Sequence, residues 1–241
     1  MSSVAAPPER GRLRGASARA GAHWSAGVER VRAHPAQATV AGVAALVLVS
    51  LWLRTRALDA GFWIDEGISV GIASFPFFDI PGVLRLDGSP PLFYLALHLW
   101  MQLFGTSESA THSLSLVFAL LSIPVAYWAG RSLFGTRVAW AAAALAAVNP
   151  FLTYYAQETR MYAMSATIGL VVAAAFLHLF VGRDRRYLPV FSLVLAVMLY
   201  THNWAIFLGI GTVAAFAALW RWAAPEEIGR ASCRERVYHP V

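Results

Sequence analysis

Long apolar runs separated by short polar breaks recur along most of this chain of 241 residues. Hydrophobic residues make up 58% of the sequence and charged residues only 13%. A helix that crosses a bilayer needs about 20 largely apolar residues, because its backbone groups must bond within the helix. The pattern therefore predicts an all-α polytopic membrane protein.

We expect about six membrane-spanning helices, counted as apolar runs of about 20 residues. The expected spans are 38–53, 111–130, 138–153 and 161–181, followed by two spans within 187–222 that the polar residues 200–203 separate. The run 90–104 is ambiguous, since proline suits its first turn but the run is barely long enough to cross.

The distribution of arginine indicates the orientation. All 19 basic residues are arginine, and six of them precede the first apolar run. If 90–104 does not cross, the arginine-bearing breaks at 131–137 and 182–186 lie on the same side as the basic N-terminus, as the positive-inside rule favours. We therefore expect 90–104 to be a juxtamembrane helix and the N-terminus to be cytoplasmic. Arg54 and Arg56 count against this topology.

The chain divides into three expected parts. Residues 1–36 read as a basic, disordered cytosolic tail, and 37–225 as the transmembrane module. We interpret 226–241 as a non-native tail produced by sequencing-adapter read-through, the alternative being an ordinary basic cytosolic tail. No inference rests on Cys233, the single cysteine. The net charge of +6 does not indicate nucleic acid, because the arginines follow the membrane pattern.

The first outer connector, about 54–110, is long enough to hold a site and two interfacial helices. It carries Asp65 and Glu66 in the stretch FWIDEGISVG. Neighbours on a helix point about 100° apart, so these carboxylates do not converge on one atom. Two interpretations of Asp65 stay open: the N-cap of a helix that starts at Glu66, or a general base at the membrane surface.

A second polar cluster lies in NPFLTYYAQETRMYAM. Arg160 stands among Tyr155, Tyr162 and other interfacial aromatic residues, where it could snorkel to water or bind a lipid-borne phosphate through its planar fork. We expect Glu158 to orient Arg160 rather than to catalyse.

A third polar break, LYTHNW, contains His202, which either binds a sugar hydroxyl or phosphate or marks a helix boundary. We interpret His98 and His178 as structural. The sequence has no Walker A loop, dinucleotide fingerprint or zinc-type Cys/His spacing, so we expect no nucleotide cofactor and assign no metal ligand.

Taken in order, the motifs WIDEG, DGSPPLFYLALHLW, SLFGTR, NPFLTYYAQETRMYAM and LYTHNW resemble the GT-C class of membrane glycosyltransferases over about residues 40–222. The branch resembled is that of protein O-mannosyltransferases and lipid A aminoarabinose transferases. The resemblance implies a GT-C-like enzyme of the bacterial inner membrane with an extracytoplasmic active site and a polyprenyl-phosphate sugar as donor. It also implies that this chain is an N-terminal fragment.

Carried onto this chain, the resemblance makes Asp65 the catalytic acid of the first outer loop, with Glu66 beside it. It implies a single inverting displacement in which Asp65 accepts the acceptor's proton. Arg160 and His202 meet the charge of the leaving phosphate, with Glu158, Tyr155 and Tyr162 in support.

The acceptor stays open between a protein, a glycan and a lipid, because Ser89 stands where protein O-mannosyltransferases carry histidine. A divalent cation also stays open, since some relatives use one and others need none. The alternatives are a transporter or flippase and a structural subunit of envelope assembly. Against a transporter, the sequence shows no paired halves, and its polar residues collect at one membrane face instead of the midplane.

Overall fold

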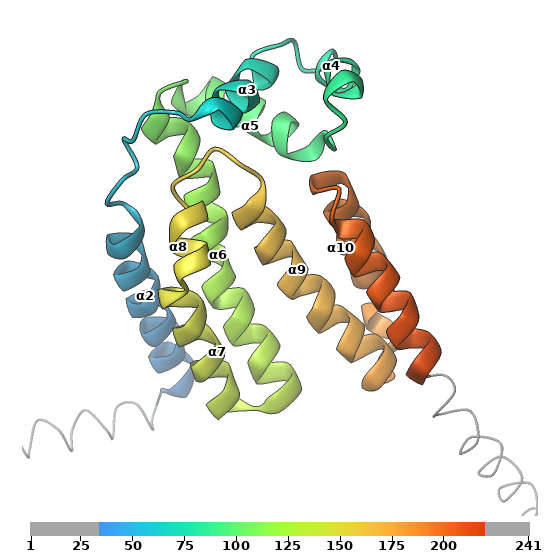
Figure 1. Cartoon of the computed structure of the whole chain (residues 1–241). Helices are drawn as coiled ribbons and strands as arrows, with labels where there is room; N and C mark the ends of the chain where they lie inside the picture. Colours follow the sequence, from blue (N-terminus) through green and yellow to red (C-terminus); the bar gives the residue numbers. More distant parts are fainter. Residues whose placement is uncertain (1–33, 220–241) are drawn as a thin grey trace, which may run out of the picture. The chain divides into compact units, whose positions relative to one another are not determined.

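The computed structural model describes residues 34–219, which are mainly helical and contain no strand (Figure 1). The chain divides into two compact units, Met1–Ala45 and Leu46–Val241, and all the candidate site residues belong to the second. The tail expected at 226–241 and most of that expected at 1–36 lie outside the described residues. The expected all-α fold class is confirmed.

The helices follow the apolar runs closely. They are α2 (Pro35–Arg54), α3 (Ile64–Ala73), α4 (Ile80–Asp87), α5 (Leu92–Phe104), α6 (Glu108–Phe134), α7 (Thr136–Val148), α8 (Pro150–Tyr155), α9 (Tyr162–Phe176), η1 (Leu177–Val181), η2 (Arg185–Tyr187), α10 (Leu188–Thr201) and a last helix, Ala205–Leu219.

Three of these helices are long and apolar enough to cross a membrane: Pro35–Arg54, Glu108–Phe134 and Tyr162–Val181. The other expected spans coincide with shorter helices. The span expected at 138–153 is divided between α7 and α8, because Pro150 cannot continue the hydrogen bonding of α7. The Asn149 side chain instead accepts from the backbone N–H of Leu152 at 3.1 Å and caps α8.

Small residues bring α6 and α7 together. A Cβ atom on Gly130 would lie only 2.8 Å from Cα of Ala139, and Ala139 and Ala143 are buried along the same face. Close approach of this kind is typical of helix packing in membranes. α6 also packs against α9, and α9 packs against α10.

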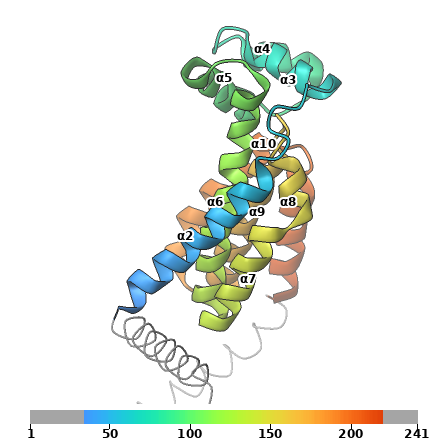
Figure 2. The same ribbon diagram turned by 90° about the vertical axis from the view of Figure 1, so that its left-hand side faces the viewer.

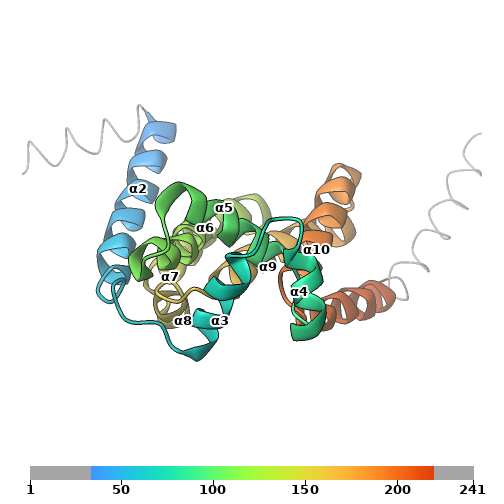
Figure 3. The same cartoon turned by 90° about the horizontal axis from the view of Figure 1, so that it is seen from above.

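The connector between α2 and α6 folds into three short helices over one end of the longer ones (Figures 2 and 3). α5 covers the run expected to form a juxtamembrane helix. It contacts α3, α6 and α10, and its Phe93, Tyr94 and Leu97 are buried. α3 is the expected helix near Asp65. α4 was not expected: it has Pro81 in its first turn and ends at Gly88, whose φ is +79°.

Arg54 is buried although the sequence places it at the end of α2. Its guanidinium donates to the backbone oxygens of Ala119 and Ala146, both at 2.6 Å. The oxygen of Ala146 lacks its helical partner, since residue 150 is a proline and has no N–H. Arg54 therefore satisfies backbone acceptors of α6 and α7. These bonds explain why an arginine lies at the end of α2 that the expected topology places outside, where arginine is rare.

Candidate functional site

Asp65 lies in the first turn of α3. The helix begins at Ile64 with Trp63 as N-cap, so the interpretation of Asp65 as the N-cap is wrong. The Asp65 side chain is 41% exposed, and its Oδ2 lies 3.6 Å from Nη2 of Arg160. The structure thus brings together an acid and a guanidinium that are 95 residues apart in the sequence.

Arg160 is held by α3 and by the nearby Tyr162. Nη1 donates to Oγ of Ser69 at 3.2 Å and to the backbone oxygen of Asp65 at 3.4 Å. The guanidinium lies 5.8 Å from the ring centre of Tyr162, and its buried Nε has no hydrogen-bond partner. Burial alone lowers the pKa of Arg160, but the Tyr162 hydroxyl and the neighbouring Tyr94 and Asp65 outweigh it, so the pKa lies above its ordinary value.

Glu66 has a different environment from Asp65. It is only 2% exposed, and both of its oxygens accept hydrogen bonds. Oε1 accepts from the backbone N–H of Thr159 at 2.6 Å and contacts Nε2 of His112 at 2.8 Å. Oε2 accepts from the N–H of Trp63 at 3.2 Å, as the third residue of a helix does in a capping box. The Glu66 carboxylate is therefore enclosed, while that of Asp65 is accessible.

The sequence analysis did not single out His112, Thr159 or Ser69. His112 is 1% exposed on α6, 46 residues from Glu66 in the sequence. A histidine in the first turns of an apolar span is a signal that could have drawn attention to it, because buried polar groups need partners. His98 and His178 bond elsewhere, to the oxygens of Ala73 and Ser132 respectively, each at 2.8 Å.

Among the described residues no hydrogen bond or ion pair joins Glu158 to Arg160, but the charge of Arg160 acts on the pKa of Glu158, and the orienting role of Glu158 stays a prediction. It is 8% exposed, and its Oε2 lacks a hydrogen-bond partner. Burial, followed by the charge of Glu66, raises the pKa of Glu158. Its own partner is Tyr154, whose pKa is raised chiefly by the hydrogen bond to Glu158.

His202 lies at the end of α10, next to the rings of Tyr162 and Tyr155. Its ring centre is 5.6 Å from that of Tyr162, which in turn lies 4.5 Å from Tyr155. The adjacent Asn203 donates to the backbone oxygen of Gly88 at 2.8 Å and ties this loop to the connector before α5. Nδ1 of His202 accepts from the N–H of Trp204 at 3.0 Å, so the other ring nitrogen carries the hydrogen.

Burial, with a smaller effect of the charge of Arg160, lowers the pKa of His202. His202 therefore faces the site as a neutral imidazole at pH 7 and can offer a hydrogen bond more readily than a charge.

This lowered pKa predicts a loss of stability in acid. Below the ordinary histidine pKa of about 6.5, the unfolded chain binds the proton more readily than the folded one. The free energy of unfolding is therefore expected to fall as the pH drops from about 7 to about 5, and the His202→Gln variant to show a shallower fall. Thermal unfolding in detergent across this range is the measurement. Parallel curves for the two proteins would contradict the assignment.

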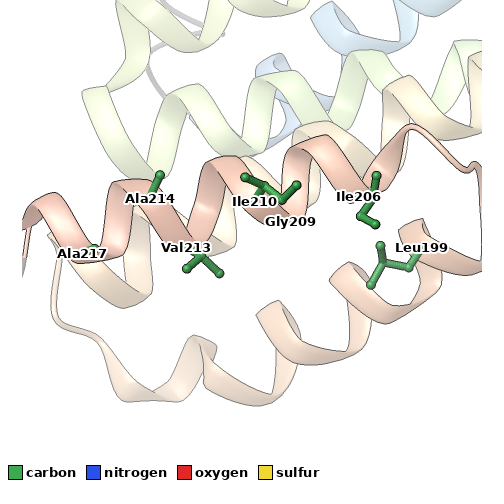
Figure 4. A pocket seen from close by; sticks show the side chains of 7 residues that line it. All are labelled: Leu199, Ile206, Gly209, Ile210, Val213, Ala214 and Ala217. Atoms are coloured by element: carbon green, nitrogen blue, oxygen red, sulfur yellow. The ribbon is translucent and has the colours of Figure 1, made fainter.

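An open apolar groove of about 470 Å³ begins near His202, between α10 and the last helix (Figure 4). Leu199 and Ile206, which lie within four residues of His202 in the sequence, are at one end of the groove, and Ala217 is at the other. The groove is lined by Leu199, Ile206, Gly209, Ile210, Val213, Ala214 and Ala217.

Between residues 34 and 219, no group of three or more His, Cys, Asp or Glu side chains is placed to hold a metal ion. No described residue is therefore assigned to the divalent cation that the resemblance left open.

The described helices, three of them long and apolar enough to cross a membrane, define an all-α membrane protein. In a comparison with models of protein families, residues 88–227 match dolichyl-phosphate-mannose-protein mannosyltransferase. The match covers more than half of the chain, and the chain belongs to this family, which is of the GT-C type and uses a lipid-linked sugar donor. Neither the curated proteins nor the solved structures gave a significant match.

Proposed function

We propose that this protein transfers a sugar from a polyprenyl-phosphate donor to an acceptor hydroxyl or amine at the extracytoplasmic membrane face, with inversion at the sugar. The observation that carries the proposal is the separation of 3.6 Å between the accessible Asp65 carboxylate and the Arg160 guanidinium. One group can accept a proton and the other can hold a phosphate, which are the two requirements of this reaction.

In the proposed step, Asp65 accepts the proton of the acceptor as the acceptor's oxygen or nitrogen attacks the anomeric carbon. The bond from that carbon to the phosphate oxygen breaks, and the bonding electrons leave with the polyprenyl phosphate. Arg160 stabilises the phosphate charge, and the neutral His202 can donate a hydrogen bond to it. Preorganised donors of this kind are often the largest contribution to catalysis.

The charge distribution supports an outward-facing site. Five exposed arginines lie at the end of α6, α7 and η1 that is opposite Asp65 (Figure 1): Arg131, Arg137, Arg183, Arg185 and Arg186. Arginine-rich ends of spans tend to remain in the cytoplasm.

The orientation predicts that single cysteines at Ser107 and Thr136 react with impermeant reagents from opposite sides of a sealed membrane. Ser107 caps the start of α6, and Thr136 starts α7 at the arginine-rich end. Reaction of both cysteines from the same side would contradict the proposed topology.

The apolar groove suits the isoprenoid chain of the donor, because it starts near His202 and is lined by apolar side chains. Filling it with a Gly209→Trp substitution is expected to raise the KM for a long-chain donor about tenfold, since each buried CH₂ contributes about 0.8 kcal/mol. The KM for a short-chain analogue should change little.

The matched control is Gly211→Trp, since an added side chain at either glycine meets open space and Gly211 does not line the groove. Equal effects of the two substitutions, or an equal rise for both donors, would exclude the groove as the chain-binding surface.

The experiment that tests the proposed function follows labelled mannose on a polyprenyl phosphate in membranes that contain the full-length protein. The label is expected to move from the organic-soluble donor into a protein or glycan fraction. Movement of the intact donor between leaflets without a glycosylated product would favour the flippase alternative.

A further inference from the structure

We infer that His112 is a positioning residue for sugar transfer, acting through Glu66 to fix the distance between Asp65 and Arg160. This inference rests on the proposed function for its consequence. The contacts that carry it form a continuous buried network between α3, α6 and the segment before α9.

The Glu66 carboxylate links α3, which carries Asp65, to the segment before α9, which carries Arg160. It accepts from the N–H of Thr159, whose next residue is Arg160, and it follows Asp65 directly in the chain. Its other oxygen accepts from the N–H of Trp63 at the start of α3. A shift of this carboxylate would therefore move the backbone on both sides of the Asp65–Arg160 pair.

His112 determines whether Glu66 can serve in this way. Its Nδ1 lies 2.7 Å from the backbone oxygen of Leu58, which can only accept, so Nδ1 carries a hydrogen. Its Nε2 faces Oε1 of Glu66, which already accepts from Thr159. The His112 ring therefore bridges the Leu58 backbone before α3 and the Glu66 carboxyl within α3, at the same oxygen that accepts from Thr159.

Neighbours of His112 on α6 hold the same segment. The Thr159 hydroxyl donates to the Thr111 hydroxyl at 2.9 Å, and Ser115 donates to the backbone oxygen of Arg160 at 3.1 Å. α6 thus holds the Arg160 segment at two positions directly, and His112, between them on the same helix, reaches α3 through Glu66. A buried network with all members bonded is rigid, and deleting one member is costly.

Two substitutions separate the contacts of His112. Gln can place its amide nitrogen near the position of Nε2 and donate to Glu66, whereas Asn can place its amide nitrogen near that of Nδ1 and donate to Leu58. His112→Asn is expected to lower kcat about 100-fold, because small misplacements of reacting groups have effects of this size. His112→Gln should retain most of kcat, and in both variants the KM for the donor should change less than kcat.

Amide hydrogen exchange gives a readout that is independent of transfer. Exchange at the amides of Trp63 and Thr159 should be faster in His112→Asn than in His112→Gln, since both amides donate to Glu66. A matched control is His178→Asn, whose ring bonds to Ser132 at the opposite helix end and should affect neither readout. If His112→Asn does not fold, Glu66→Gln provides the second test, because an amide offers one acceptor oxygen instead of two.

The results that would overturn the positioning role differ from those that would overturn the proposed function. Equal kcat for the Asn and Gln variants, faster amide exchange with normal kcat, or normal kcat in Glu66→Gln would each overturn the positioning role. Absence of transfer by the unsubstituted protein would instead contradict the proposed function, and the exchange rates would still report whether His112 holds Glu66.

Discussion

Replacing Asp65 by asparagine is expected to lower the rate of sugar transfer by about 10³-fold, within the range of 10² to 10⁴ typical of a general base. Asparagine has nearly the same size and keeps its place on α3, but its amide does not accept the acceptor's proton. The fall should appear in kcat, measured with a saturating polyprenyl-phosphate donor. Expression and membrane insertion should be unchanged, because the Asp65 side chain is partly exposed.

Asp79→Asn is the matched control for this prediction. Asp79 is an exposed carboxylate in the same connector, and its side chain does not cap α4. Its substitution should leave transfer near the unsubstituted rate. A retained rate in Asp65→Asn would remove the general-base assignment, and an equal loss in Asp79→Asn would indicate a charge effect of the whole connector.

Replacing Arg160 by lysine is expected to lower kcat about 100-fold and to raise the KM for the donor, since one lost transition-state donor has an effect of 10² to 10³. Lysine retains the positive charge but not the planar fork that binds Ser69, the Asp65 backbone and a phosphate together. Steady-state kinetics with varied donor concentration separates the two effects.

Arg186→Lys is the control for Arg160, because Arg186 is exposed at the opposite helix end. Normal kinetics in Arg160→Lys would show that a positive charge at this position is sufficient for transfer and that the planar guanidinium is not required. Normal kinetics in Arg160→Gln as well would show that Arg160 does not meet the phosphate.

The positions of the helices could be predicted because membrane spans depend on local composition. Each expected span coincides with one or more helices, and the break at Asn149-Pro150 follows from the missing N–H of proline. The short helix α4 was missed because eight residues containing Pro81 and Gly82 have no clear helical pattern.

The partners within the site could be predicted only in part. Tyr155, Tyr162 and Arg160 lie together as their sequence positions suggested, but the pairing of Arg160 with Asp65 rather than with Glu158 depends on tertiary packing. The contact of Glu66 with Thr159 spans 93 residues, so no local pattern could reveal it.

A structure of the protein with a bound polyprenyl-phosphate sugar tests the central claim most directly. The proposed function predicts phosphate oxygens within hydrogen-bond distance of Arg160 and the anomeric carbon on the side of the phosphate that faces Asp65, with room between them for an acceptor hydroxyl. A donor phosphate bound away from Arg160, or an anomeric carbon out of reach of any acceptor that contacts Asp65, would contradict it.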